Sequence, residues 1–269
     1  MNGDSSTKLE KLKENIKQMG SVAIAFSGGV DSTFLSKISY DLLGKNAVAV
    51  TAISATYPKS ELDHAKKIAK SIGIKHLFIT TEETESKVFM NNPINRCYFC
   101  KKELFLKIKT IAKQENLNHV LDGSNFNDTG DYRPGMKALS ELEIISPLLE
   151  VKLTKQEIRE LSKAINLETW NKPAYACLAS RFPYGEKITA SKLNRVEKAE
   201  SYLFALGIEQ VRVRYHNTIA RIEVSKEDVQ NIVQRSEDIV KRLKELGFEY
   251  VTLDLEGYRT GSLNEVLKQ

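Results

Sequence analysis

Short apolar runs rich in β-branched residues alternate with helical patterns through the first two thirds of the chain. The runs that we expect to form strands lie at 22–26, 47–53, 76–80, 119–122 and 144–147. The segments between them have helical spacing of apolar residues, at about 32–43, 60–72, 100–115 and 155–165. This alternation predicts an α/β fold that is doubly wound around a mostly parallel sheet.

The pattern changes after Arg181. A helix is expected over 190–206, followed by strands at 211–215 and 219–224, a helical region over 226–246 and a strand at 250–255. These elements predict a smaller C-terminal α+β domain over 181–269, behind a first domain over 1–180.

Composition limits the class of protein. The chain has 269 residues, of which 41% are hydrophobic and 28% charged, as expected for an ordinary globular protein. No apolar run is long enough for a signal peptide or a transmembrane helix, so we expect a cytoplasmic protein with no membrane partner. The net charge of +5 is spread over the first domain. This distribution argues against a dedicated nucleic-acid module.

The most informative motif is Ser27-Gly28-Gly29-Val30-Asp31-Ser32, directly behind the first expected strand. Two glycines let the backbone approach an anion closely, and the first N–H groups of a helix then face it. Ser27 and Ser32 add hydroxyl donors, and Asp31 is a candidate magnesium ligand. An ordinary strand-to-helix turn is the alternative.

This motif lacks the lysine of a Walker A loop and the spacing of a dinucleotide-binding turn. It resembles the PP-loop of the ATP pyrophosphatases, which cleave ATP between the α and β phosphates. The resemblance implies that the chain activates a substrate by adenylation and that Ser27, Gly28, Gly29, Asp31 and Ser32 contact ATP.

Polar residues follow two other expected strands at the same edge of the sheet. Ser54 follows the second strand, where PP-loop proteins hold adenine. Asp122 and Ser124 follow the fourth strand, and Asp128 and Asp131 come soon after. Ligands of parallel sheets bind beyond the carboxyl ends of the strands, and magnesium prefers carboxylates together with phosphate oxygens. We interpret Asp122 and Ser124 as ATP and magnesium contacts, with a solvated loop as the alternative.

The chain has three cysteines, an odd number that does not indicate a disulfide framework. Cys97 and Cys100 form a CxxC at the start of an expected helix, which suits a redox dithiol, half of a zinc site or part of an iron–sulfur site. A cubane cluster on three thiolates leaves one iron open, and three cysteines match that number. Cys177, taken alone, is also typical of a small buried hydrophobic residue.

Basic residues alternate along one expected strand of the C-terminal domain. Arg212, Arg214 and His216 would point to one face, because side chains alternate along a strand. Two arginines on one face suit a phosphate, since the guanidinium binds its oxygens bidentately. An exposed basic face without a ligand is the alternative.

Several segments together resemble the LarE family over nearly the whole chain: 27–32, 96–101, 122–125, 173–184, 211–216 and 257–262. LarE proteins adenylate a pyridinium dicarboxylate mononucleotide and replace the activated oxygen with sulfur, during assembly of the nickel-pincer nucleotide of lactate racemase. The resemblance implies the same activity here, with ATP and Mg²⁺, on a sheet of the adenine-nucleotide α-hydrolase type. It also implies that the C-terminal domain binds substrate or mediates homo-oligomerisation.

The resemblance further implies roles for single residues. Cys177 matches the active cysteine of the family, and Ser180, Arg181 and Glu200 match positions near it. Arg259 is a further candidate. Some family members sacrifice the sulfur of one cysteine, leaving dehydroalanine. Others hold a [4Fe-4S] cluster on three thiolates, whose open iron carries a sulfide.

Several interpretations are open for the sulfur source and for the exact function. The presence of Cys97 and Cys100 beside Cys177 favours the cluster-bearing subtype, with sacrificial use of Cys177 as the alternative. A tRNA 2-thiolation enzyme, an amidating synthetase and a non-catalytic ATP-binding regulator are alternative functions. We expect a small nucleotide substrate; the donor that reloads sulfur does not follow from the sequence.

Overall fold

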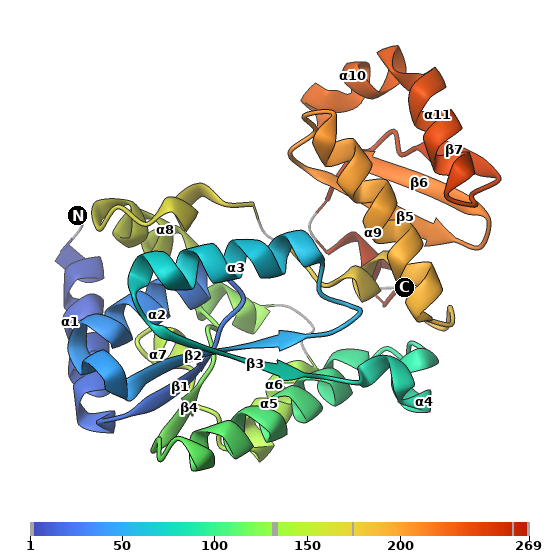
Figure 1. The fold of residues 1–269 in the computed structure, drawn as a ribbon. Coiled ribbons are helices and arrows are strands. Elements are labelled where there is room, and N and C mark those ends of the chain that lie inside the picture. Colours follow the sequence, from blue (N-terminus) through green and yellow to red (C-terminus); the bar gives the residue numbers. More distant parts are fainter. Residues whose placement is uncertain (1–2, 131–133, 174, 260, 268–269) are drawn as a thin grey trace. The chain divides into compact units, whose positions relative to one another are not determined.

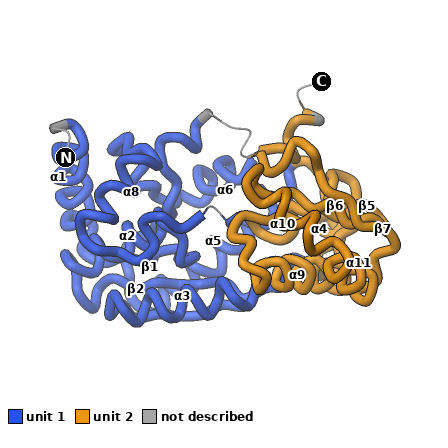
Figure 2. The backbone as a smooth tube through the Cα atoms, turned by 90° about the horizontal axis from the view of Figure 1, so that it is seen from above, with its two compact units in different colours: residues 1–83, 95–175 blue, residues 84–94, 176–269 orange. Residues whose placement is uncertain are grey.

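A computed structural model describes residues 3–130, 134–173, 175–259 and 261–267 (Figure 1). The chain forms two compact units, which are described separately (Figure 2). One unit comprises 1–83 and 95–175, and the other comprises 84–94 and 176–269. Among the described residues, no helix is both long and apolar enough to cross a membrane.

The first unit contains a parallel sheet with the strand order β3-β2-β1-β4. Its strands are β1 (Val22–Ala25), β2 (Ala47–Ile53), β3 (Lys75–Thr80) and β4 (His119–Leu121). Its helices of at least four residues are α1 (Gly3–Met19), α2 (Val30–Leu43), α3 (Lys59–Ile72), α5 (Arg96–Gln114), α6 (Gly135–Glu141), α7 (Pro147–Glu150) and α8 (Lys155–Ala164). The predicted α/β fold with a parallel sheet is confirmed.

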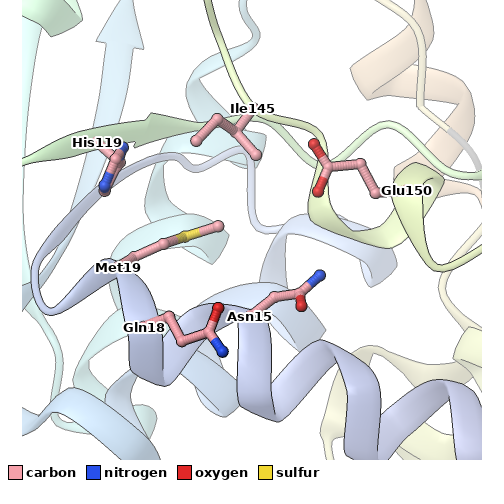
Figure 3. A pocket seen from close by; sticks show the side chains of 6 residues that line it. All are labelled: Asn15, Gln18, Met19, His119, Ile145 and Glu150. Atoms are coloured by element: carbon pink, nitrogen blue, oxygen red, sulfur yellow. The ribbon is translucent and has the colours of Figure 1, made fainter.

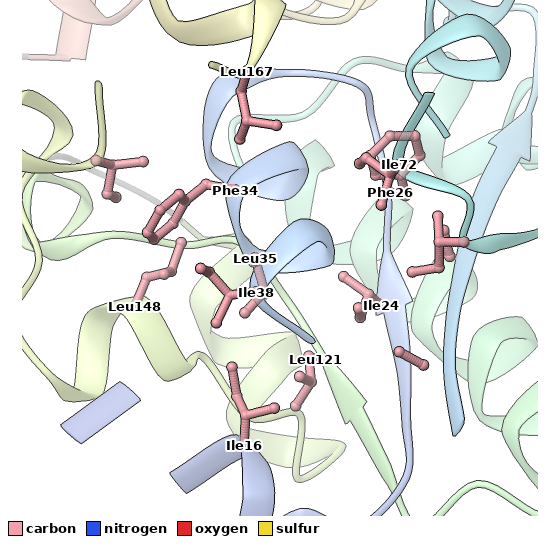
Figure 4. Close-up of a cluster of buried hydrophobic side chains, with 14 of the residues drawn as sticks. Ile16, Ile24, Phe26, Phe34, Leu35, Ile38, Ile72, Leu121, Leu148 and Leu167 are labelled. Atoms are coloured by element: carbon pink, nitrogen blue, oxygen red, sulfur yellow. The ribbon is translucent and has the colours of Figure 1, made fainter. Parts of the chain in front are cut away.

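Alternation along the strands buries both faces of this sheet. Val22 and Ile24 of β1 belong to the core under α1, α2, α3 and α8 (Figure 4), whereas Ala23 belongs to the core under α5 and α6. Because side chains of a strand point alternately to opposite faces, a continuous apolar run serves two helical layers. This double burial explains why the sequence shows the strands as unbroken apolar runs.

Two expectations about elements were incomplete. The segment expected as a strand at 144–147 forms only one isolated bridge, between Ile145 and Leu121. Pro147 follows and begins α7, because proline lacks the N–H that a longer ladder needs and suits the first turn of a helix. The sequence analysis also assigned no helix before the first strand, where α1 buries Leu12 and Ile16 completely.

The second unit contains a mixed sheet with the strand order β5-β6-β7. Its elements are α4 (Lys87–Met90), α9 (Ala190–Ala205), β5 (Val211–His216), β6 (Ile219–Val224), α10 (Val229–Gln234), α11 (Ser236–Glu245) and β7 (Tyr250–Leu253). Strands β5 and β6 are antiparallel, and β7 joins β6 in parallel after the two helices. The predicted smaller α+β part is confirmed; its assignment to substrate binding stays a prediction.

Segment 84–94 joins this second unit through a clasp around Asn92. The side-chain amide of the fully buried Asn92 donates to the carbonyls of Phe182 and Pro183 at 3.3 and 2.6 Å. The backbone carbonyl of Asn92 accepts from Gly185 N–H at 3.0 Å. Asn92 has a positive φ of 50°, which asparagine tolerates better than most residues. Segment 84–94, which comes much earlier in the sequence, is thereby part of the C-terminal unit.

Candidate functional site

The glycine turn lies at the carboxyl end of β1, and its geometry requires glycine. Gly28 has a φ of +63°, and a Cβ atom there would lie 2.9 Å from the Cα atom of Ala65 in α3. Both constraints exclude a larger residue, because a left-handed backbone and a blocked Cβ position each oppose an L side chain. Gly29 caps α2 with its backbone alone, so the capping residue has no side chain to bind the first N–H groups of this helix.

Two serine hydroxyls brace the turn from inside. The Ser32 hydroxyl accepts from Ser27 N–H at 3.2 Å and lies 3.0 Å from the Ser27 hydroxyl. Ser32 is buried and Ser27 is exposed. The turn thus lies at a helix N-terminus, where the helix dipole favours negative charge. Its contact with ATP stays a prediction.

Asp31 lies in the first turn of α2 and pairs with Lys155 of α8 through its Oδ2 atom. Its Oδ1 atom is buried and has no hydrogen-bond partner among the described residues. Burial raises the pKa of Asp31, an effect that the charge and hydrogen bond of Lys155 oppose. An oxygen in this state can coordinate a divalent cation, which is the chemistry that the sequence assigned to Asp31.

Lys155 was not among the predicted site residues. It contacts Asp31 across 124 residues of sequence, so no local motif announces the pair. Lys155 directly follows the capping residue Thr154, and this sequence position predicts only that a helix begins there.

The Asp122 loop packs against the glycine turn. A Cβ atom on Gly123 would lie 3.2 Å from the backbone nitrogen of Ser32, so this loop also needs a glycine for close approach. Asp122 itself is buried; its Oδ1 accepts from Ser124 N–H at 2.9 Å and from the Ser146 hydroxyl at 2.8 Å.

The second oxygen of Asp122 accepts from Lys101, at 3.3 Å, on the helix that carries the CxxC. Burial acts to raise the pKa of Asp122, but the Lys101 charge and the hydrogen bonds hold it below its usual value. Asp122 therefore holds its loop together in this structure. Its predicted contact with ATP or magnesium, like that of Ser124, stays a prediction. Asp131 lies outside the described residues.

Ser54 follows β2 at the same sheet edge. Its hydroxyl lies 2.9 Å from the hydroxyl of Thr56, which donates to the buried carboxylate of Glu83 at 2.7 Å. The position that the sequence assigned to adenine is thus a hydrogen-bonded turn supported by a buried acid.

Cys97 and Cys100 lie at the start of α5, as the sequence predicted for the CxxC. Cys97 is exposed and Cys100 is half-buried. Residues three apart on a helix lie on the same side, so both thiols are presented together. Among the residues that the structure describes, no group of three or more His, Cys, Asp or Glu side chains is arranged to hold a metal ion.

Cys177 lies in the second unit and is exposed, in contrast to the small buried cysteine that its apolar neighbours alone suggested. It precedes the short 3₁₀ helix Leu178–Arg181. The fully buried Arg181 donates to the carbonyls of Ala176 and Cys177, at 2.6 and 3.0 Å, and to the Ser180 hydroxyl at 3.0 Å. Its remaining nitrogens bind both oxygens of Glu200. Arg181 and Glu200 thus hold the backbone that presents the thiol.

The two predicted phosphate-binding arginines are buried on β5. Arg214 donates to the Ser180 carbonyl, to Glu223 and to the Ser262 hydroxyl, each at 2.8 Å. Arg212 lies 5.2 Å from the ring centre of Tyr258. The strand is therefore not an exposed basic face.

The other two basic candidates of this unit differ in their surroundings. His216 is half-buried, and its pKa is lowered by burial and by the charges of Arg221 and Arg214. Arg259 is paired with Glu256 at 2.9 Å and with Glu265 at 3.1 Å.

A small surface pocket lies elsewhere in the first unit (Figure 3). It is lined by Asn15, Gln18, Met19, His119, Ile145 and Glu150. Because His119 begins β4, the pocket lies at the amino edge of the sheet, opposite the glycine turn. None of the predicted site residues lines it.

Comparisons with known proteins show the class of enzyme to which the chain belongs. The sequence profile of NAD synthase matches residues 6–104, which include the glycine turn. A glutamine-hydrolyzing GMP synthase of Pyrobaculum aerophilum is 26% identical over 184 residues, which cover 61% of this chain and 35% of that protein. The fold and the turn define an ATP-dependent enzyme of the PP-loop class, which acts by adenylation.

Two relatives match almost the whole chain. An uncharacterized protein of Synechocystis is 47% identical over 97% of this chain and 98% of its own length. Pyridinium-3,5-bisthiocarboxylic acid mononucleotide synthase of Lactiplantibacillus plantarum is 38% identical over 97% of this chain and 95% of its own length. The chain belongs to the LarE family of ATP-dependent sulfur transferases.

Proposed function

We propose that this enzyme adenylates a carboxylate of a pyridinium dicarboxylate mononucleotide and converts it to a thiocarboxylate, in nickel-pincer nucleotide biosynthesis. The observation that carries the proposal is the 38% identity to the L. plantarum synthase over nearly the full chain. The PP-loop with Asp31 in the first turn of α2 supports it. The small nucleotide substrate follows from the same relative.

The chemistry proceeds in two displacements. A carboxylate oxygen of the substrate attacks the α-phosphorus of ATP, and pyrophosphate leaves with the electron pair of the broken bond. A sulfur nucleophile then attacks the activated carbonyl carbon, and AMP leaves. The N–H groups at the start of α2 suit the phosphates, and Asp31 would hold Mg²⁺, which neutralises charge on the leaving pyrophosphate.

In the second unit, Arg212, Arg214 and His216 would bind the substrate phosphate. The Nε atom of Arg214 supports this role, because it is buried without a hydrogen-bond partner among the described residues. The guanidinium is held at both ends by Glu223 and the Ser180 carbonyl, which connects a phosphate site to the segment of Cys177. Residues 181–269 would thus form the substrate domain.

For the sulfur source, we propose a [4Fe-4S] cluster held by Cys97, Cys100 and Cys177. The donor set fits, since thiolates are the ligands of such clusters and the CxxC presents two of them at a helix N-terminus. When bound, the cluster would supply a renewable sulfide at its open iron.

Sacrifice of Cys177 is the competing source. The exposed thiol and the fixed backbone favour it, because a presented thiolate is itself a competent nucleophile. In that case Cys177 loses its sulfur and becomes dehydroalanine.

The deciding experiment measures iron and acid-labile sulfide in protein purified and reconstituted without oxygen, with its visible absorption spectrum. We expect about four irons per chain, lost when any one cysteine is replaced by alanine. Absence of iron, with dehydroalanine at Cys177 after one turnover, would overturn the cluster and establish the sacrificial route.

A second assay separates the alternative functions. Pyrophosphate release from ATP with the pyridinium substrate excludes a regulator that only binds ATP. Unchanged tRNA thiolation in a deletion strain excludes a tRNA 2-thiolation enzyme. A homo-oligomer in a cytoplasmic setting completes the proposal, and sedimentation of the purified protein tests the oligomer.

A further inference from the structure

Two carbonyl groups of the PP-loop accept hydrogen bonds from side chains that lie outside the loop and have no role in the proposed reaction. The hydroxyl of Tyr57 donates to the Ser27 carbonyl at 2.7 Å, and Lys172 Nζ donates to the Gly28 carbonyl at 3.3 Å. We propose that Tyr57 and Lys172 are positioning residues that set the phosphate-binding conformation of the loop.

The roles of Tyr57 and Lys172 follow from the polarity of the peptide group, which has an N–H donor on one side and a carbonyl acceptor on the other. A loop that binds phosphate must direct its N–H groups at the anion and keep its carbonyl oxygens away, because these oxygens repel negative charge. Gly28 has a positive φ and lacks a side chain, so the backbone preference of this residue alone does little to prevent a peptide flip. Donors on the carbonyls of Ser27 and Gly28 supply that restraint from outside.

Tyr57 lies in a turn that is itself stabilised by hydrogen bonds. Its N–H donates to the Ser54 carbonyl at 3.2 Å, and the adjacent Thr56 hydroxyl donates to Glu83, which is 3% exposed. Burial raises the pKa of the Tyr57 hydroxyl, and the charge of Glu61 adds to this effect. The hydroxyl is therefore protonated at physiological pH and remains a donor.

Lys172 is oriented by an ion pair. Its Nζ lies 2.8 Å from Glu61 Oε2, and the side chains of both residues are 16% exposed. Arg159 of α8 donates to the Lys172 carbonyl at 2.8 Å, which fixes the backbone at this position. The ammonium group therefore meets the loop in one defined place, although it comes from 144 residues further along the chain.

The test compares ligands that do and do not contact the loop. Binding of Mg²⁺ with α,β-methylene-ATP, of pyrophosphate and of adenosine is measured by calorimetry for Tyr57→Phe and Lys172→Met. We expect each variant to bind the ATP analogue and pyrophosphate about 5- to 20-fold more weakly, and adenosine with unchanged affinity, because the hydrogen bond to a loop carbonyl is lost. In Lys172→Met the ion pair with Glu61 is lost as well. Lys172→Arg should recover part of the loss, since it retains a charged donor.

Lys67→Met is the matched control. Lys67 is on α3 like Glu61 and pairs with Glu168 at 2.8 Å, but both side chains are more than half exposed and neither contacts the loop. We expect this variant to bind all three ligands as the unmodified protein does. An equal loss of adenosine binding in Tyr57→Phe and Lys172→Met, or unchanged binding of the ATP analogue, would overturn the proposal. So would the same phosphate-specific loss in Lys67→Met.

Discussion

The guanidinium of Arg181 binds both carboxylate oxygens of Glu200, at 2.9 and 2.8 Å, and the two side chains are almost completely buried. The same guanidinium donates to the Cys177 carbonyl, so the pair stabilises the backbone that presents this cysteine. Glu200 also accepts from Val213 N–H at 2.9 Å, which ties the cluster to β5.

Replacing this guanidinium should be costly. Arg181→Lys retains the charge but cannot make the bidentate bond and the carbonyl bonds together, so we expect a loss of about 3 kcal/mol in the free energy of unfolding. Urea denaturation measures it. Arg242→Lys is the control, since Arg242 pairs with Glu245 at the surface of α11 and should change stability by less than about 0.5 kcal/mol. Equal effects of the two substitutions would contradict the structural role of Arg181.

Asp31→Asn should strongly slow the first half-reaction without unfolding the protein. An amide is a poor magnesium ligand, so we expect pyrophosphate release to fall at least about 100-fold. The melting temperature should stay the same or rise, because burial already disfavours the charged carboxylate, whose pKa is raised. Retained pyrophosphate release would remove Asp31 from the magnesium site.

Gly28→Ala separates backbone strain from steric blockage when it is compared with Gly20→Ala. Both glycines have a positive φ, but the added methyl group would lie 2.9 Å from the Ala65 Cα at Gly28 and 3.6 Å from Asn118 at Gly20. The left-handed conformation should cost each variant about 1 kcal/mol. Only Gly28→Ala should also lose binding of the ATP analogue. Normal binding of the ATP analogue by Gly28→Ala would contradict the close contact between Gly28 and Ala65.

Stability should depend on pH through His76. Burial and the nearby charge of Lys66 lower its pKa to about 4, and its Nε2 lies 2.7 Å from the Thr51 hydroxyl. A lowered pKa means that the unfolded chain binds the proton first, so stability is lost as the pH falls from about 6.5 to about 4.

The measurement is urea denaturation at pH 7, 5.5 and 4.5 for the unmodified protein and His76→Gln. Glutamine can still bond to Thr51 but does not titrate, so its stability should fall less steeply over this range. Parallel curves for the two proteins would show that His76 does not contribute.

Much of the fold follows from local order in the sequence. Strands that serve two helical layers are continuous apolar runs, and the sequence analysis placed β1, β2, β3 and β4 within one residue of their observed starts. The glycine turn is equally local, because strand, glycines and helix N-terminus are consecutive and create an anion site together. These features, and the family that the motifs resemble, were determined by the sequence.

The contacts that give the candidate site and the second unit their geometry join distant segments, and only the tertiary structure decided them. Lys155 reaches Asp31 across 124 residues, and Asn92 reaches Pro183 across 91. From its residue type alone, a lysine or an asparagine is expected at the protein surface. Whether such a side chain meets a buried carboxylate or carbonyl depends on how the chain packs, because an unpaired buried polar group is costly and the fold must supply its partner.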